Sequence, residues 1–206
     1  MSETRFKFKK CELLPNEGSS LDEKYELLGG GPIVDYYESI DSPTVSMNIT
    51  FIDIDQVVSR KGISGGEHID ITIEIDGFDD FKLTKKKHNL MLNSVRNVIT
   101  ETNKQVATLE FVSVESIINE TARVNKKFTG NVSQTVSELL VSYKKGIQTK
   151  KKLDKHDAAN SYSFIGNLKR PFDTIQWLCP KSQSSAKNFG FLFYENFDGY
   201  HFKSIE

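Results

Sequence analysis

Alternation between apolar and polar residues runs through the first half of the chain and predicts β-strands. In residues 69–76 isoleucine occupies every second position and Asp, Thr or Glu occupies the others. One face of this strand is therefore apolar and the other is polar. Asp76-Gly77 comes next, a dipeptide that favours a tight hairpin turn into a second strand over residues 78–85.

Similar strand signals occur at residues 4–14, 33–40, 45–54 and 106–114, with Gly- and Pro-containing segments between them. Strands at this spacing predict a small antiparallel β-barrel or sandwich. In the strand over 45–54, Asp53 and Asp55 alternate with Ile52 and Ile54. This alternation predicts that the two carboxylates lie on a solvated face and bind no cation.

The second half of the chain changes to a helical period. Apolar residues recur at i, i+3, i+4 and i+7, namely Val136, Leu139, Leu140 and Tyr143. This spacing predicts an amphipathic helix with Ser133 as N-cap and Gly146 as C-terminal stop. We also expect helices over 115–122 and from Pro171 to Pro180.

The last residues predict an aromatic β-hairpin around Asp198-Gly199, with strands over 190–196 and 200–205. Its aromatic rings are expected to be buried against the helix that begins at Pro171. The fold class is therefore mainly β with α+β: a small antiparallel barrel over 1–114, then a mixed helix and hairpin domain over 115–206.

Composition and charge exclude several classes of function. The 206 residues contain 27 Lys and Arg against 28 Asp and Glu, so no net field attracts nucleic acid. No apolar stretch is long enough to span a membrane or to serve as a signal peptide. Cys11 and Cys179 have no partners at metal-ligand spacing. We expect a soluble protein without metal or cofactor, and the lysine-rich residues 144–157 predict an exposed, solvated connection.

Two other functions remain open from the residues alone. Gly62-Ile63-Ser64-Gly65-Gly66 matches the G-x-S-x-G pattern of a hydrolase, in which Ser64 would be the nucleophile and His68 or His201 the base. The segment leads into a strand and not a helix, which favours a simple turn. Alternatively, the aromatic hairpin could bind a glycan or a peptide in a monomeric module.

Three stretches of the sequence resemble a known family. They are Val34-Asp35-Tyr36-Tyr37-Glu38-Ser39-Ile40 with Pro43, then residues 63–73 with Gly66-Glu67, and finally Arg170-Pro171-Phe172-Asp173-Thr174-Ile175 with residues 190–196 and 198–205. In this order they resemble the baseplate or tail hub proteins of contractile-tailed phages. These hubs are related to the amino-terminal half of type VI secretion spike proteins.

The resemblance implies a structural virion protein without catalytic residues. Hub proteins form a homotrimer whose barrels make a ring between the central spike, a lysozyme-type protein, and the tail tube, so the ring adapts one symmetry to another. The protein would be assembled in the host cytoplasm, without required contact to nucleic acid or membrane. The sequence stops where the family continues into a second barrel, so we expect the amino-terminal half of such a hub. Candidate ring-interface residues are Ile69, Ile71, Ile73, Ile75 and Phe78.

Overall fold

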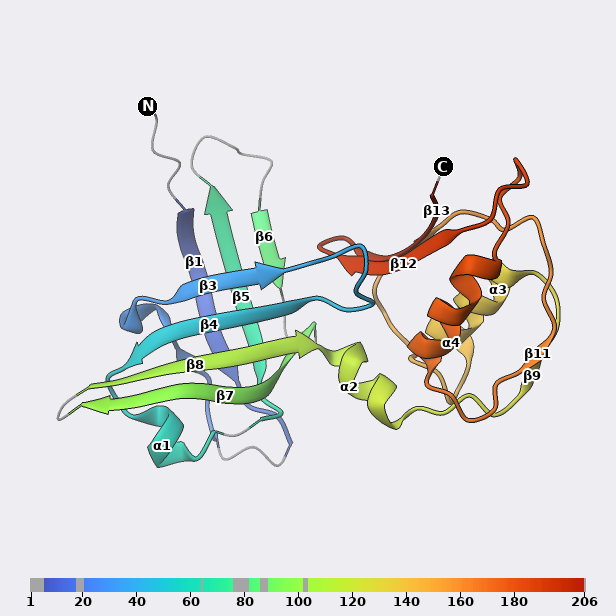
Figure 1. Cartoon of the computed structure of the whole chain (residues 1–206). Helices are drawn as coiled ribbons and strands as arrows, with labels where there is room; N and C mark the ends of the chain where they lie inside the picture. Colours follow the sequence, from blue (N-terminus) through green and yellow to red (C-terminus); the bar gives the residue numbers. More distant parts are fainter. Residues whose placement is uncertain are drawn as a thin grey trace. The chain divides into compact units, whose positions relative to one another are not determined.

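The computed structural model describes residues 6–17, 21–63, 65–75, 82–85, 89–101 and 104–205 (Figure 1). The chain divides into two compact units: unit 1 contains residues 1–37 and 46–114, and unit 2 contains residues 38–45 and 115–206. The two contiguous domains expected from the sequence, 1–114 and 115–206, stay a prediction. The assignment of residues 38–45 to unit 2 was not expected from the sequence.

Unit 1 is built on an eight-stranded antiparallel sheet, in the order β2-β1-β5-β7-β8-β4-β3 with β6 also paired to β5. The strands are β1 (Phe6–Leu14), β2 (Tyr25–Glu26), β3 (Ile33–Tyr37), β4 (Ser46–Asp53), β5 (His68–Ile75), β6 (Lys82–Lys85), β7 (Leu90–Glu101) and β8 (Lys104–Ser113). The mainly β fold is confirmed. A closed barrel is not, because β2 and β3 end the strand order without pairing to each other in the described residues.

The core of unit 1 follows from the two-residue period of its strands. Figure 1 shows β1, β5 and β6 running across the direction of β3, β4, β7 and β8. Alternate positions of β1, β5, β4 and β8 are fully buried, among them Leu13, Ile71, Ile49 and Phe111. Burial of apolar side chains along β1, β4, β5 and β8 is the main favourable term that holds such a sheet together.

Strand β7 was not predicted from the sequence, although it is the longest strand of the described chain. Its pairing with β8 shifts register between Leu92 and Ser94 and again between Arg96 and Ile99. Each bulge inserts an unpaired residue and breaks the alternation of apolar and polar positions. The pattern that predicts a strand is therefore absent from a segment that nevertheless forms one.

The prediction for Asp53 was wrong. Asp53 is fully buried, whereas Ile52 and Ile54 are exposed. Met47 sets the buried face of β4, and Asp53 continues that face at the end of the strand. Its carboxylate accepts hydrogen bonds from the amides of Val57 and Val58, both at 2.8 Å, at the start of the short helix α1 (Val57–Lys61). Burial is tolerated because helix amides replace water as donors.

Unit 2 combines a three-stranded sheet with short helices. Its elements are α2 (Val114–Thr121), β9 (Lys127–Phe128), α3 (Val132–Ser137), the π-helical turn η2 (Glu138–Ser142), β10 (Leu153–Lys155), β11 (Phe164–Ile165), α4 (Pro171–Leu178), the 3-10 turn η3 (Cys179–Lys181), β12 (Phe191–Asn196) and β13 (Gly199–Ser204). The first residue of α2 belongs to unit 1. In the sheet, β13 pairs antiparallel with β12 and parallel with β10.

The predicted helix over 133–146 forms with different ends. Its N-cap is Asn131, whose side-chain oxygen accepts from the Ser133 amide at 2.9 Å. Ser133 lies inside the first turn, so its assignment as cap was wrong. The helical residues end at Ser142; Tyr143 adopts an extended conformation, and its amide donates a last helical hydrogen bond to the Glu138 carbonyl at 2.8 Å. The carbonyl of Tyr143 then accepts from the Gly146 amide at 2.8 Å in a separate turn.

The aromatic hairpin and α4 form much of the core of unit 2, as predicted. Phe193 and Tyr200 stack with ring centroids 5.7 Å apart, and Phe172 of α4 lies 5.7 Å from Phe193. Phe191, Phe193, Tyr200 and Phe202 are all buried. The expectation fails for Phe189 and Phe197, which are 65% and 41% exposed because they flank β12 and do not lie on its buried face.

Candidate functional site

A buried charged cluster in unit 2 joins the first and third stretches of the family resemblance. It starts from β12, where Phe191, Phe193 and Glu195 share the buried face of the strand. The Glu195 side chain is fully buried, which is rare for a carboxylate unless charged or polar partners replace water. The partners come from two distant segments of the chain.

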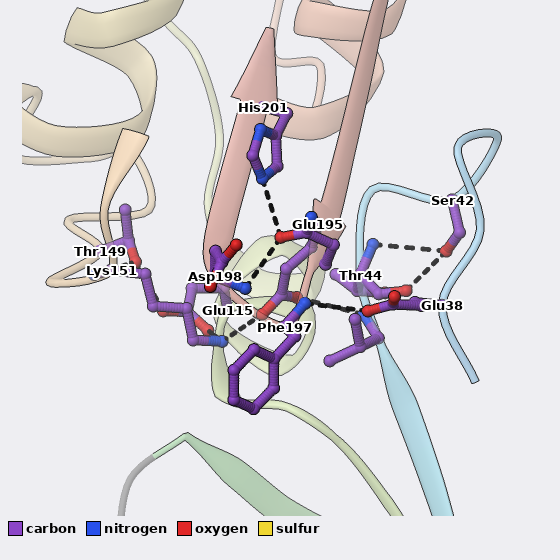
Figure 2. Close-up of polar contacts among 12 residues, drawn as sticks. Glu38, Ser42, Thr44, Glu115, Thr149, Lys151, Glu195, Phe197, Asp198 and His201 are labelled. Carbon is purple, nitrogen blue, oxygen red and sulfur yellow. Dashed lines mark hydrogen bonds and ion pairs between the residues drawn. The ribbon is translucent and has the colours of Figure 1, made fainter. Parts of the chain in front are cut away.

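Lys151 supplies the positive charge of this site. Its Nζ donates to Glu195 Oε1 at 2.7 Å and to Glu115 Oε2 at 2.5 Å, and the Lys151 side chain is only 13% exposed (Figure 2). The Thr149 hydroxyl donates to the other oxygen of Glu115 at 2.6 Å and accepts from the Lys151 amide at 3.1 Å. We call Glu115, Thr149, Lys151 and Glu195 the Lys151 cluster.

Backbone geometry on β13 brings Lys151 to this position. Gly199 has φ of +135°, and a Cβ atom there would lie 2.4 Å from the carbonyl oxygen of Lys152. That same carbonyl accepts from the Tyr200 amide at 2.8 Å. Because only glycine has no Cβ and adopts this φ without strain, Gly199 lets the segment with Lys151 approach β13 closely.

The cluster also holds residues 38–45, which carry part of the first stretch of the resemblance. Glu195 Oε2 accepts from the Val45 amide at 3.1 Å, and the Glu195 amide donates to the Ser42 carbonyl at 3.4 Å. At the other end of the segment, Glu38 accepts from the Phe197 amide at 2.8 Å (Figure 2). The Ser42 hydroxyl donates to the carbonyl of Thr44 at 2.7 Å, which closes the turn between them.

Electrostatics explain why the cluster positions the chain more than it adds net stability. Each carboxylate accepts from the Lys151 ammonium and from a neutral donor, which is Thr149 for Glu115 and the Val45 amide for Glu195. Attraction inside the protein is offset by the cost of removing three charges from water. The cluster has two negative charges and one positive charge, so loss of Lys151 removes the one cation that both carboxylates share, and the arrangement strongly favours one geometry.

Tyr200 borders the cluster and remains neutral. Burial, reinforced by the nearby charges of Glu195 and Glu115, raises the pKa of Tyr200 well above its ordinary value. Lys151 Nζ lies 5.8 Å from the centroid of its ring. The buried Tyr200 hydroxyl has no hydrogen-bond partner among the described residues. The ring therefore contributes packing and a cation–π contact, and the hydroxyl contributes no hydrogen bond there.

One feature of the sequence could have predicted this cluster. In the strand over 190–196, Glu195 falls in register with Phe191 and Phe193, on the face expected to be buried. Lys151 carries no such signal, because it stands between Lys150 and Lys152 in a basic run. The expectation that residues 144–157 form an exposed connection was wrong for Lys151 and for β10.

The residues expected at a ring interface lie on β5 or beyond the described chain. Ile69, Ile71 and Ile73 are buried in unit 1. The side chain of Ile75 and all of Phe78 lie outside the described residues. A role of this strand in a ring stays a prediction. On its other face Asp70, Thr72 and Glu74 are half-buried, and Asp70 and Glu74 pair with Lys10 and Lys9.

The residues of the hydrolase alternative fall in different parts of the chain. Ser64 lies outside the described residues. His68 is buried in unit 1 with Nδ1 3.2 Å from the carbonyl oxygen of Leu90, and His201 in unit 2 has Nε2 2.8 Å from Asn196 Oδ1. In the described part of the chain, no three His, Cys, Asp or Glu side chains gather as a metal site. No described helix is long and apolar enough to cross a membrane.

Comparison with known proteins identifies the fold. The sequence matches no family model and no curated protein. The fold is similar to that of the prophage MuSo2 43 kDa tail protein from Shewanella oneidensis (TM-score 0.54, 10% identity, 96% of this chain and 55% of that one). It is equally similar to a tail protein from Neisseria meningitidis (TM-score 0.54, 10% identity, 96% and 51%).

A third similar structure comes from a secretion system. The E. coli c3393 protein is described as a type VI secretion component with structural similarity to the T4 tail proteins gp27 and gp5 (TM-score 0.50, 10% identity, 97% of this chain and 48% of that one). The chain thus has the fold of phage tail and type VI secretion proteins and spans about half of their length. The resemblance inferred from the sequence is confirmed at the level of fold.

Proposed function

We propose that this protein is a structural subunit of a phage tail baseplate, a hub that joins the central spike to the tail tube. The observation that carries the proposal is the shared fold over 96% of the chain with the tail proteins of Shewanella and Neisseria. The order of the sequence stretches that resemble hub proteins supports the same assignment independently.

In this function the protein acts by its shape. Three copies would form a ring that adapts the threefold spike to the tube, with the sheet of unit 1 serving as the barrel wall of each copy. Strongly paired antiparallel strands suit such a ring because the backbone hydrogen bonds make it stiff. The Lys151 cluster would keep residues 38–45 in one conformation within each copy. The location would be the virion, after assembly in the host cytoplasm.

The mass of the protein in solution tests the proposal. A homotrimer, or a monomer that becomes a trimer when a spike protein or the remaining half of a hub is added, would support it. A monomer that stays monomeric with these partners and hydrolyses an ester or glycoside substrate would refute it. Rapid labelling of Ser64 by a fluorophosphonate would favour the hydrolase instead.

Two substitutions locate the ring surface. Thr72→Arg places a large cation on the outer face of β5, and Asn48→Arg makes a similar change on the outer face of β4. If β5 faces the neighbouring copy, Thr72→Arg alone should shift the trimer toward monomer, because an unpaired charge in an interface is costly. Loss of the trimer only with Asn48→Arg would move the ring surface to β4 and contradict the assignment of β5.

A further inference from the structure

A cation-lined hollow in unit 2 is separate from the Lys151 cluster. It measures about 430 Å³ and lies between the end of α2 and the segment over residues 144–148. Its charged lining residues are Arg123, Lys144 and Lys145, and the described lining contains no carboxylate. Half-buried Ile118 and Ala122 supply an apolar part of the wall.

The cations of this hollow have no acidic partner among the described residues. Arg123 Nη1 donates to the backbone carbonyls of Glu120 and Ala122, at 2.9 and 2.7 Å, at the C-terminal end of α2, and forms no ion pair with a described carboxylate. Lys144 and Lys145 are exposed and form no described ion pair. By contrast, Lys151 and Lys155 of the same basic run each pair with a carboxylate.

The carboxylates near the hollow pair with other cations and do not neutralise Arg123, Lys144 or Lys145. Arg170 Nη1 contacts Glu120 at 2.6 Å, and Lys126 pairs with Glu138. Unit 2 as a whole contains 14 Lys and Arg against 11 Asp and Glu, although the complete chain has a net charge of −1. Like charges gathered at one opening repel each other, and a bound anion relieves that repulsion.

We propose that this hollow binds the carboxylates of an acidic polypeptide segment. The Asn125 side chain accepts from the Tyr143 hydroxyl through its oxygen at 2.7 Å, which leaves its amide protons for an anionic ligand. The apolar part formed by Ile118 and Ala122 suits the methylene groups of glutamate. A single-stranded nucleic acid would need aromatic rings on which its bases stack, and none of the lining residues is aromatic.

The test measures binding of a short fluorescein-labelled oligoglutamate peptide to the full chain by fluorescence anisotropy. The Lys144→Gln/Lys145→Gln double variant should weaken binding about tenfold, since each lost charge contact contributes up to about one factor of five. The matched control is Lys150→Gln/Lys152→Gln, which removes the same charge from exposed lysines of the same run that do not line the hollow. This control should change the affinity less than about twofold.

Three outcomes overturn the proposal. They are an equal loss of affinity in both double variants, no measurable binding of the peptide, and tighter binding of a labelled oligothymidylate or of inorganic phosphate in competition with the peptide. Unfolding of both variants, followed by the fluorescence of Trp177, checks that the fold is unchanged. The solution mass that tests the hub function does not depend on this result, so either proposal can fail alone.

Discussion

Removal of the Lys151 ammonium gives the sharpest test of the buried cluster. In the Lys151→Met variant the carboxylates of Glu115 and Glu195 lose their shared cation, while their side chains are only 7% and 0% exposed. Methionine fills a similar volume, so the variant isolates the charge from the packing. The two neutral donors, Thr149 and the Val45 amide, remain in place.

The expected loss follows from the cost of removing the cation that two buried carboxylates share. Removal of one partner from a buried ion pair costs about 3–5 kcal/mol. Because each carboxylate keeps a neutral donor, we expect the low end, about 3 kcal/mol of unfolding free energy. With a urea m-value of about 1.5 kcal/mol per M, the midpoint of unfolding should fall by about 2 M.

Tryptophan fluorescence during urea unfolding measures this loss of stability in unit 2, which contains the Lys151 cluster. The chain contains a single tryptophan, Trp177, which belongs to unit 2. Its ring packs edge-on against Tyr162 and Phe164, with centroids 5.6 and 5.4 Å apart, so its emission should change when unit 2 unfolds. The control is Lys155→Met, whose lysine pairs with the exposed Asp157 and should leave the midpoint nearly unchanged.

A compensated variant separates charge imbalance from simple loss of a side chain. The triple change Glu115→Gln, Lys151→Met and Glu195→Gln removes all three charges and keeps an acceptor oxygen for Thr149 and for the Val45 amide. Its stability should return to within about 1 kcal/mol of the natural protein, since a neutral replacement removes the desolvation cost together with the attraction. A single variant that loses less than about 1 kcal/mol, or a triple variant as unstable as the single one, would refute this account.

Three further predictions concern other buried groups. Tyr200→Phe removes a buried hydroxyl without a described partner, so unfolding should require the same or about 1 kcal/mol more free energy, and a loss above that would contradict the contact assignment. Burial raises the pKa of Cys11 and Cys179 to about 12. Both thiols should therefore resist a disulfide reagent at pH 8 in the native protein and react with it in urea. Fast labelling of the native protein would disprove their burial. Gly199→Ala would press its Cβ against the Lys152 carbonyl at 2.4 Å, and thermal unfolding should show destabilisation by a few kcal/mol, whereas an unchanged midpoint would show that this approach is not required.

The local pattern of apolar and polar residues was sufficient to predict the secondary structure of segments in which that pattern is regular. The alternation over 69–76 predicted β5, and the Asp198-Gly199 turn with its flanking aromatics predicted the hairpin of β12 and β13. Pro171 correctly marked the start of α4. Strand β7 was missed because bulges interrupt its period, and a strand is recognised by its period only where its pairing register is uninterrupted.

Two carboxylates show the limit of the same pattern. Asp53 and Glu195 each occupy the end of a buried strand face, Asp53 after Phe51 and Glu195 after Phe193. Alternation places both on those faces, but the charge of a carboxylate argues for solvent, and for Asp53 the solvated prediction was wrong. In both cases the structure supplies donors that take the place of water, which is the condition for burying a carboxylate.

The sequence alone determined that the chain is mainly β in its first part, mixed in its second, and similar in order of motifs to tail hub proteins. Only the tertiary structure decided that Lys151, and not Lys150 or Lys152, is largely removed from solvent. It also decided that residues 38–45 belong with unit 2. The physical reason is distance along the chain: Lys151 and Glu195 are 44 residues apart, and Val45 and Glu195 are 150 residues apart. Local periodicity states which side chains share a face, but the partner on the other side of that face is set by how the whole chain folds.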